Sequence, residues 1–464
     1  MTKTRGGFSR GFTRRGFMAT GSAALLGSTA LGSGLFSGRP AYAQDFDLVA
    51  TSGEPVYFRG WQFRTDVVQS NVDAYNERMN GNVDYATVTG DYPSLMETTL
   101  IANGDLDVLY ANPSSAVRYM GGGWVMPAAE LPNGQEIADS MYDNIREAWS
   151  VNGQLLGLSY FVSVRGTLLA NLQRLDEAGF GDDPLPTTWD QLYETIYALH
   201  EAGVETPFLP HWFAEWFGIS WGFLFEVMNR GGQVADAETH QPMMTVDGPA
   251  GATLEAWKRL WNSGLVPEEV LSYNEAAYID AFRSGRYVFS PQQIYDIKTF
   301  NDPAQSADVA GHISLLPGTE QSWGLIDSAM YLMTSRDRPD ALTDDVMRFT
   351  SWYGYKDENG DFAVANRWLE ENMLFSAYRP VMESDAAREA IQSSVARPED
   401  YDTVLEVYAA TPYPKGVWNV VWSEEFNVWL REKLFSFLQD DLPVAEVIEE
   451  ANAEITRLNE RYGI

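Results

Sequence analysis

The chain has 464 residues, of which 45% are hydrophobic and 13% aromatic, and its net charge at pH 7 is −33. This length exceeds a single hydrophobic core, so we expect two domains, and the composition excludes a disordered chain. The negative charge argues against nucleic acid or anionic membranes as partners; it could favour a cationic solute, although a solvated acidic surface explains it better. The absence of cysteine excludes disulfides, thiolate metal sites, cysteine nucleophiles and a lipid anchor on cysteine.

The first 43 residues have the pattern of a twin-arginine-type signal peptide. Arg14 and Arg15 precede a mildly apolar stretch at 23–36, and a small-x-small cleavage sequence follows at 41–43. The apolar stretch is short and glycine-rich, which argues against a membrane anchor, and no later stretch is apolar enough to span a bilayer. We therefore expect an exported, soluble periplasmic protein. Residues 1–43 carry six basic and no acidic residues, so removing them takes the net charge from −33 to −39.

Strand and helix patterns alternate in the next part of the chain. Short apolar runs predict strands at 56–58, 83–88 and 106–110, and apolar residues at helical spacing predict helices at 67–79 and 92–102. This alternation implies βαβ units and a mainly parallel sheet.

The alternating pattern restarts after about residue 155, which indicates a second α/β lobe. A strand-rich region covers 155–171, and Thr188 is a plausible N-cap with Gln191 placed as in a capping box. Further helical patterns cover 212–228 and 248–262.

The stretch 281–296 places polar residues where ligands often bind. Gly285 ends a helix, residues 286–290 have the composition of a buried strand, and Pro291 ends that strand. Gln292, Gln293 and Tyr295 would then lie on the loop beyond its carboxyl end, where open α/β sheets bind ligands. A plain surface loop explains these residues equally well.

The remaining chain predicts strands at 312–316 and 330–333 and a tail helix over 443–461 with one apolar face. The four histidines lack metal-ligand spacing, and a calcium-like sequence at 357–361 is better explained as a β-turn. We expect neither a cofactor nor a metal.

The order of these features resembles the extracellular solute-binding proteins of sugar ABC transporters, the maltose-binding-protein-like family 1. The matching segments are 101–108, 157–160 with Asn171, 185–192, 229–232, 261–267, 281–290 and the tail helix. The resemblance implies an α/β, two-lobed periplasmic-binding-protein fold of type II. In it each lobe would be a mainly parallel sheet flanked by helices, and a hinge of several crossovers would join the lobes.

By the same resemblance, one lobe would hold residues 45–160 plus 320–380, and the other 161–319 plus 381–464. The protein would be a monomer without enzymatic activity. It would bind a mono- or oligosaccharide between the lobes and deliver it to ABC transporter permease subunits. The ligand would close the lobes because it touches both and binds the closed state better.

A carbohydrate site needs apolar ring faces for stacking and planar polar groups for hydroxyls. Position in the chain and the family resemblance select the candidates, although core packing explains each aromatic residue taken singly as well as ligand contact does. Arg64 and Arg165 would suit an anionic group on the sugar, and surface salt bridges explain them equally well. The candidate ligand-binding residues are Trp61, Arg64, Tyr110, Asn112, Tyr160, Arg165, His211, Trp212, Glu215, Trp216, Gln292, Tyr295, Trp323, Asp327, Arg379, Trp418 and Trp422.

Two other functions stay open. A binding protein of the same fold could take a cationic solute such as a polyamine, with acids and aromatics around its ammonium groups. A secreted glycoside hydrolase would need two positioned carboxylates, and none of the acids in the sequence is marked out for this role. Turnover would separate the hydrolase from both binding proteins.

Overall fold

A computed structural model of the chain describes residues 52–318 and 322–464. The predicted signal peptide, 1–43, lies outside the described residues. The described residues form one compact unit. Within the described part of the chain, no helix has both the length and the apolar character needed to cross a membrane.

The core of the molecule is one eight-stranded sheet. Its main path runs, in spatial order, through β2 (Val83–Thr87), β1 (Val56–Gly60), β3 (Val108–Ala111), β10 (Leu325–Thr334), β7 (Leu158–Asn171) and β8 (Phe289–Gln293). Two short strands, β4 (Val125–Met126) and β9 (Ile313–Leu315), pair with β10 and β7. A separate hairpin consists of β5 (Ser150–Val151) and β6 (Gln154–Leu155).

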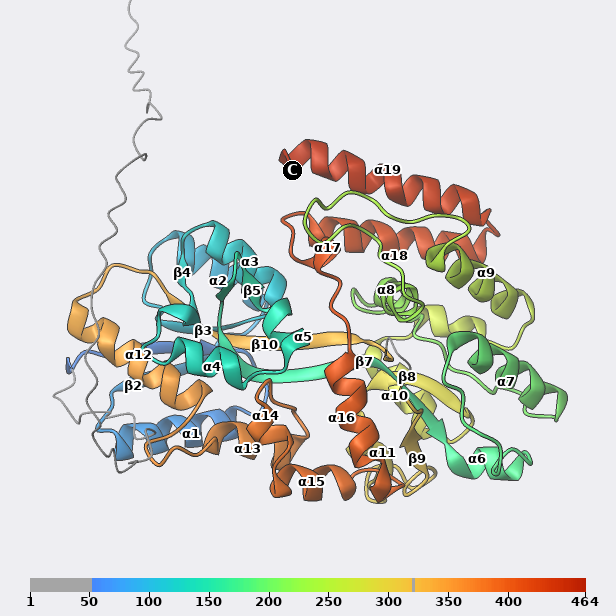
Figure 1. The fold of residues 1–464 in the computed structure, drawn as a ribbon, viewed down its shortest axis with the longest axis horizontal. Coiled ribbons are helices and arrows are strands. Elements are labelled where there is room, and N and C mark those ends of the chain that lie inside the picture. The colour runs from blue at the N-terminus through green and yellow to red at the C-terminus, as the bar shows by residue number, and fades with distance from the viewer. Residues whose placement is uncertain (1–51, 319–321) are drawn as a thin grey trace, which may run out of the picture. The chain divides into compact units, whose positions relative to one another are not determined.

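Helices cover both ends of this sheet and define two lobes (Figure 1). The first lobe contains β1–β4 with α1 (Thr65–Arg78), α2 (Tyr92–Ile101), α3 (Pro113–Gly121), α4 (Gly134–Ser140), α5 (Asp143–Ala148), α12 (Asp340–Gly354) and α13 (Ala363–Asn372). The second lobe contains β8 and β9 with α6 (Leu172–Glu177), α7 (Trp189–Glu201), α8 (Ile219–Asn229), α9 (Pro249–Asn262), α10 (Glu275–Arg283), α11 (Asp296–Asn301), α17 (Lys415–Trp418), α18 (Ser423–Gln439) and α19 (Val444–Tyr462). The remaining helices are α14 (Arg379–Met382), α15 (Asp385–Gln392) and α16 (Tyr401–Ala410).

The two-lobed α/β fold is confirmed, but among the described strands parallel pairing is confined to the first lobe. The second lobe has one isolated parallel bridge, from Phe208 to Phe289. β1 pairs in parallel with β2 and β3, whereas β10 is antiparallel to β3 and β7, and β7 is antiparallel to β8 and β9. Strand–helix alternation predicts parallel pairing when one crossover returns the chain to a neighbouring position. After β7, however, the chain passes through α6 to α10 before β8 pairs with it, so the alternation does not fix the direction of this pair.

Several local predictions are confirmed. The Thr188 side chain accepts a hydrogen bond from the backbone N–H of Gln191 and caps α7. Gly285 follows α10 with φ +71, the left-handed conformation that glycine adopts without strain. The apolar face of the tail helix is buried from Val444 to Leu458.

The predicted strand at 286–290 is shifted toward the carboxyl end. Pro291 does not end it but lies inside β8, paired with Leu168 of β7. On its other side β8 has, among the described residues, only one bridge, from Phe289 to Phe208, so beyond that point we treat it as an edge strand. A proline is tolerated there because no neighbour needs its missing N–H.

The predicted helix at 212–228 starts later, because residues 212–218 form a loop and α8 begins at Ile219. Gly218 allows this loop to fold back: its backbone N–H donates to Glu215 O, and a Cβ there would clash with Phe213 O. Only glycine permits so close a backbone approach.

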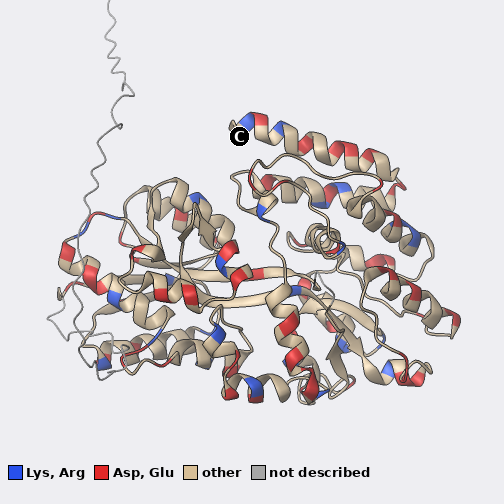
Figure 2. Cartoon of the chain, in the orientation of Figure 1, with Lys and Arg blue, Asp and Glu red and all other residues tan. Residues whose placement is uncertain are grey.

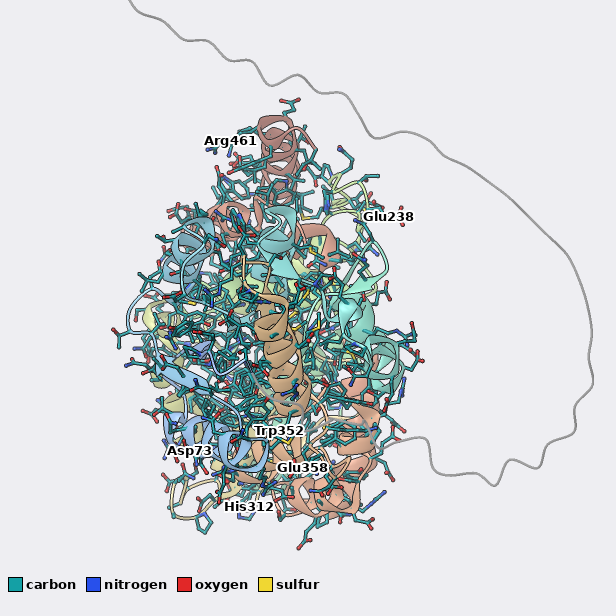
Figure 3. The ribbon with its side chains drawn as sticks, turned by 90° about the vertical axis from the view of Figure 1, so that its left-hand side faces the viewer. Asp73, Glu238, His312, Trp352, Glu358 and Arg461 are labelled. Atoms are coloured by element: carbon teal, nitrogen blue, oxygen red, sulfur yellow. The ribbon has the colours of Figure 1, made fainter. Side chains whose placement is uncertain are left out.

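Acidic side chains are spread over the helices of both lobes rather than gathered on one face (Figure 2). Residues 357–361 form a turn, as predicted, because Asp357 Oδ1 accepts from the backbone N–H groups of Asn359 and Asp361 at 2.9 and 3.0 Å. Trp352 Nε1 holds the adjacent Glu358 at 2.6 Å (Figure 3).

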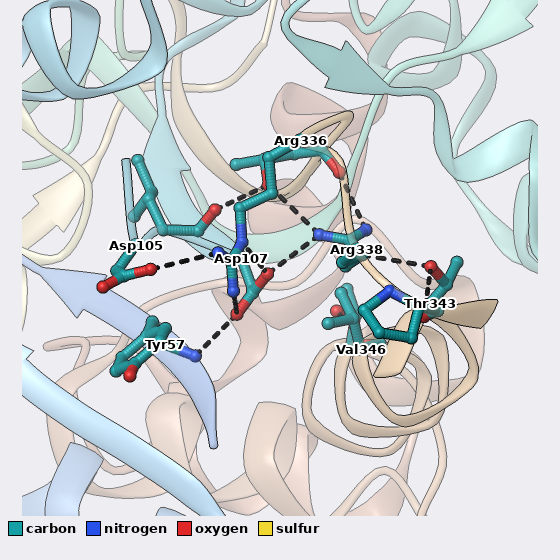
Figure 4. A network of polar contacts seen from close by, with 11 residues as sticks. Tyr57, Asp105, Asp107, Arg336, Arg338, Thr343 and Val346 are labelled. Atoms are coloured by element: carbon teal, nitrogen blue, oxygen red, sulfur yellow. Dashed lines mark hydrogen bonds and ion pairs between the residues drawn. The ribbon is translucent and has the colours of Figure 1, made fainter. Parts of the chain in front are cut away.

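A buried carboxylate ties the parallel strands to β10 (Figure 4). Asp107, directly before β3, accepts from Tyr57 N of β1 at 2.9 Å. Its oxygens also accept from Arg336 Nε at 2.7 Å and Arg338 Nη1 at 2.9 Å, both just after β10. One buried acid thus connects three strands of the first lobe.

Candidate functional site

A cleft of about 550 Å³ lies where the two lobes meet over β10. Volumes of this size are typical of sites for small organic ligands. Its lining residues are Gly90, Asp91, Tyr92, Pro93, Asn112, Pro113, Ser114, Trp216, Trp221, Ile326, Asp327, Ser328, Tyr413, Trp418, Ser423, Glu424, Asn427 and Val428.

The first-lobe wall consists of the N-terminal ends of α2 and α3, which follow the carboxyl ends of β2 and β3. Asp91 caps α2, and its carboxylate accepts from Ser94 N and Ser94 Oγ at 3.4 and 2.6 Å. Asn112 caps α3 through Oδ1, which accepts from Ser115 N at 2.8 Å. The Nδ2 donor of Asn112 has no hydrogen bond to the described residues.

The second-lobe wall is aromatic. The Trp221 and Trp418 rings lie 4.3 Å apart at 42°, and the Trp216 ring is 5.3 Å from Trp221 at 88°. Tyr413 packs edge-on against Trp418 at 5.2 Å. These rings therefore form an angular surface rather than one flat platform.

Trp216 is unusual because 52% of it is exposed. Its backbone is nevertheless fixed, since its carbonyl accepts from Asn427 Nδ2 and, at 3.2 Å, from Ser220 Oγ. A large apolar ring held at the mouth of a cleft is suited to contact a ligand.

The floor of the cleft presents Asp327 from near the start of β10. Its Oδ2 accepts from Arg165 Nε at 3.2 Å and Gln293 Nε2 at 2.7 Å. Its Oδ1 accepts no hydrogen bond from the described residues. The carboxylate is therefore oriented by β7 and β8, and one of its oxygens stays without a partner among the described residues.

Arg165 is buried beneath this floor and does not line the cleft. Its Nη1 contacts Glu275 Oε1 at 2.8 Å, and its guanidinium lies 4.2 Å from the Phe217 ring. Burial opposes its charge, but the Asp327 and Glu275 carboxylates outweigh burial and raise the pKa of Arg165. Its charge is thus matched within the protein, which removes the need for an anionic ligand group.

Two further buried groups near Arg165 have shifted pKa values. Burial, followed by the Glu275 carboxylate, raises the pKa of Asp296 to about 7. Burial and then the Arg165 charge lower the pKa of His211 to about 3. At neutral pH His211 is therefore uncharged, and its Nδ1 lies 3.1 Å from Gly218 O, in the loop that carries Trp216.

Four predicted candidates line the cleft: Asn112, Trp216, Asp327 and Trp418. Arg165 and Glu215 act behind it, because Arg165 orients Asp327, and Glu215 Oε2 accepts from Glu275 N at 2.7 Å. The structure buries five others in the second lobe, away from the cleft lining: His211, Trp212, Gln292, Trp323 and Trp422. Tyr295 is half-buried at the start of α11.

Polar side-chain atoms of Gln292, Trp323 and Trp422 have partners inside the protein. Gln292 Nε2 donates to Ser290 Oγ at 2.8 Å, because this residue lies inside β8 rather than on a loop. The indole N–H groups of Trp323 and Trp422 donate to Pro317 O and Asn459 Oδ1, both at 2.8 Å.

Three predicted aromatics form a stack in the first lobe. The Tyr110 and Tyr160 rings are 4.5 Å apart at 14°, and Trp61 lies 4.8 Å from Tyr110. Tyr92 lies between this stack and the cleft, 5.5 Å from Trp61. The stack therefore supports the cleft wall without lining it.

Arg64 and Arg379 lie on the surface in ion pairs. Arg64 contacts Glu371 at 2.9 Å, and Arg379 contacts Asp143 at 3.2 Å. Salt bridges thus explain Arg64, and neither residue lines the cleft.

The sequence analysis missed lining residues from four segments of the chain. They are Asp91 and Tyr92, Trp221, Tyr413, and Glu424 with Asn427. Asp91 and Tyr92 follow the strand at 83–88, so the rule that selected Asn112 would have found them. No local sequence pattern marks Trp221, Tyr413, Glu424 or Asn427 as a lining residue. Among the described residues, no group of His, Asp and Glu is arranged to hold a metal ion.

Solved sugar-binding proteins share this fold at low sequence identity. The maltose-bound MalE3 of T. maritima is 16% identical, with a TM-score of 0.68 over 87% of this chain and 99% of that chain. The sugar-binding protein MalE from Xanthomonas citri is 14% identical, with a TM-score of 0.68 over 88% and 98%. A chitin oligosaccharide binding protein is 15% identical, with a TM-score of 0.67 over 88% and 99%. No curated protein sequence matches this chain.

A family model gives the stronger assignment. The model described as bacterial extracellular solute-binding protein matches residues 64–354, which is more than half of the chain. The matched range includes the first-lobe wall, the Trp216 loop and the β10 floor of the cleft. The chain therefore belongs to the bacterial extracellular solute-binding protein family.

Proposed function

We propose that this protein captures a carbohydrate in the cleft and delivers it to the permease of an ABC transporter. The observation that carries the proposal is the cleft itself, in which an aromatic wall from one lobe faces capped helix ends from the other. Structural neighbours with the same fold support it, because their descriptions include bound maltose and, in an ABC transporter solute binding protein from Agrobacterium vitis, bound D-mannitol.

The lining residues supply the two kinds of contact that sugars require. Trp216 and Trp418 offer apolar faces to the C–H surfaces of a sugar ring. Asn112 Nδ2 would donate to a hydroxyl group, and Asp327 Oδ1 would accept from one. Since Asn112 belongs to the first lobe and Trp216 to the second, one ligand touches both.

Closure follows from these bilobal contacts. β7 and β10 run through both lobes, and each has a register shift, at Arg165/Thr167 and at Ala329/Met330. Gly166, at the first shift, has φ +89, a backbone conformation that favours glycine. Bending at these positions would bring the walls together, and a ligand that contacts both walls would favour the closed population.

The cellular context is also a proposal. The twin-arginine-type signal supports export to the periplasm, and the lack of cysteine supports a form without a lipid anchor. The family consists of solute-binding proteins, which supports a non-enzymatic, monomeric receptor that binds permease subunits and not nucleic acid.

Isothermal titration calorimetry of the purified protein against neutral mono- and oligosaccharides tests this proposal. We expect one saturable site for at least one sugar, a ligand-dependent rise in melting temperature, and recovery of the sugar unchanged by chromatography. If the protein bound none of these carbohydrates, the proposal would be refuted. Appearance of a cleaved sugar would instead support a glycoside hydrolase.

A further inference from the structure

The charges that line the cleft are all of one sign. Asp91, Asp327 and Glu424 contribute carboxylates from the first lobe, the floor and the second lobe. Among the described residues that line the cleft there is no Lys, Arg or His. The nearest buried cation, Arg165, is already paired with Asp327 and Glu275.

These three carboxylates differ in how many hydrogen bonds they already accept from the protein. Asp91 is occupied by its cap contacts with Ser94. Asp327 has one oxygen engaged and one without a partner among the described residues. Glu424 is exposed in the first turn of α18 and makes no hydrogen bond or ion pair with the described residues. The helix end favours its negative charge but leaves its oxygens available.

The aromatic wall adds an independent observation. Of the three indoles Trp216 is the most open to solvent, with 52% of it exposed, whereas Trp221 already has the Arg165 guanidinium 5.6 Å from its ring centroid. The face of an indole ring attracts an ammonium group through cation–π attraction as well as accepting the C–H surface of a sugar.

We propose that the solute of this cleft is a carbohydrate that carries a protonated amine. Its ammonium group lies against the exposed Trp216 ring, with Asp327 Oδ1 and Glu424 as counter-charges. Its hydroxyl groups meet Asn112 and the remaining polar lining. This inference rests on the proposed function and narrows its substrate class. Sugars with carboxylate or phosphate groups are excluded, because they would face carboxylates with no available cation.

Matched ligands test the charge directly by calorimetry on the purified protein. The probes are glucose, glucosamine and N-acetylglucosamine, the disaccharide of glucosamine with its N-acetylated form, and spermidine. We expect the amine form to bind about tenfold more tightly than its neutral counterpart. The preference should shrink between low and high sodium chloride, because salt screens the carboxylates.

The outcomes separate this inference from the broader function. Equal or weaker binding of the amine form would overturn the inference and leave carbohydrate capture standing. Binding of spermidine with no sugar bound would support ammonium recognition and overturn the carbohydrate assignment. Failure of every probe, together with failure of the neutral sugars tested above, would overturn both.

Two variants test whether the cleft carboxylates cause the preference for the amine form. Glu424→Gln should reduce the preference for the amine form, measured as the ratio of its affinity to that of the neutral sugar, about threefold, and its exposed position protects the fold. Glu238→Gln is the matched control, since Glu238 is also an exposed acid but lies on a loop outside the cleft lining (Figure 3). An equal loss of preference in both variants would overturn the assignment to the cleft carboxylates.

Discussion

Replacing Asp107 by Asn should strongly destabilise the first lobe. The side chain keeps its shape but loses the charge that faces Arg336 and Arg338, whose exposed fractions are 14% and 4%. Removing one partner of a buried ion pair costs about 3–5 kcal/mol, because the remaining charge stays buried without compensation. The entropy of unfolding grows with chain length, and for a chain of this length each kcal/mol of lost stability lowers the melting temperature by roughly 1 °C. The melting temperature should therefore fall by about 3–5 °C.

Urea unfolding followed by tryptophan fluorescence and circular dichroism measures this loss. The matched control is Asp105→Asn, because Asp105 contacts Arg336 at 3.1 Å but is 72% exposed. An exposed pair contributes about 0–1 kcal/mol, so the control should change the free energy of unfolding little. If Asp107→Asn cost no more than the control, Asp107 would not be the counter-charge that joins these strands.

Two further predictions concern the cleft and the hinge. Trp216→Ala should weaken binding of the carbohydrate ligand by about tenfold or more, since it removes an apolar stacking face. It should change the free energy of unfolding by only about 0.5 kcal/mol, since the ring is half exposed. Phe63→Ala is the control, because Phe63 is exposed and lies outside the cleft lining, and equal effects of the two variants on binding would contradict the role of Trp216. Asp296 has a pKa raised from 3.8 to about 7, so between these pH values the folded state holds a proton that the unfolded chain has released. Protonation of Asp296 therefore contributes at most about 4 kcal/mol to the free energy of unfolding. This contribution is complete below pH ~4 and is lost as pH rises through about 7. Asp296→Asn should therefore flatten the fall in stability between pH 4 and 7 and exceed the parent protein in stability at pH 8, and an unchanged slope in urea midpoints across this range would contradict the assignment.

Much of the fold follows from local patterns in the sequence. The strands at 56–58 and 83–88 and the tail helix depend on apolar periodicity and on neighbouring turn residues, so short windows suffice to predict them. Thr188 and Gly285 are recognisable because capping depends on one residue type at one position. Pro291 misled the prediction, because whether proline ends a strand depends on the neighbouring strand, which short windows do not show.

The cleft could be predicted only in part. Asn112 follows a strand whose carboxyl end opens toward a ligand, and this rule uses local information. Trp221, Tyr413 and Glu424 meet only because α8, the segment before α17, and α18 pack in the same lobe. The core tryptophans Trp212 and Trp323 have the same residue type as Trp418, and only tertiary packing separates a stacking ring from a core ring.

The central position of β10 sets an order of events during synthesis. β10 pairs with β3, which ends at Ala111, yet β10 itself begins at Leu325. At a usual rate of ~5–20 residues per second, β3 leaves the ribosome roughly 10–40 seconds before its partner exists. Throughout this interval β3 carries an unpaired edge, and such edges invite pairing with other chains. A nascent chain of this protein therefore depends on protection of that edge until the strand that both lobes share has been made.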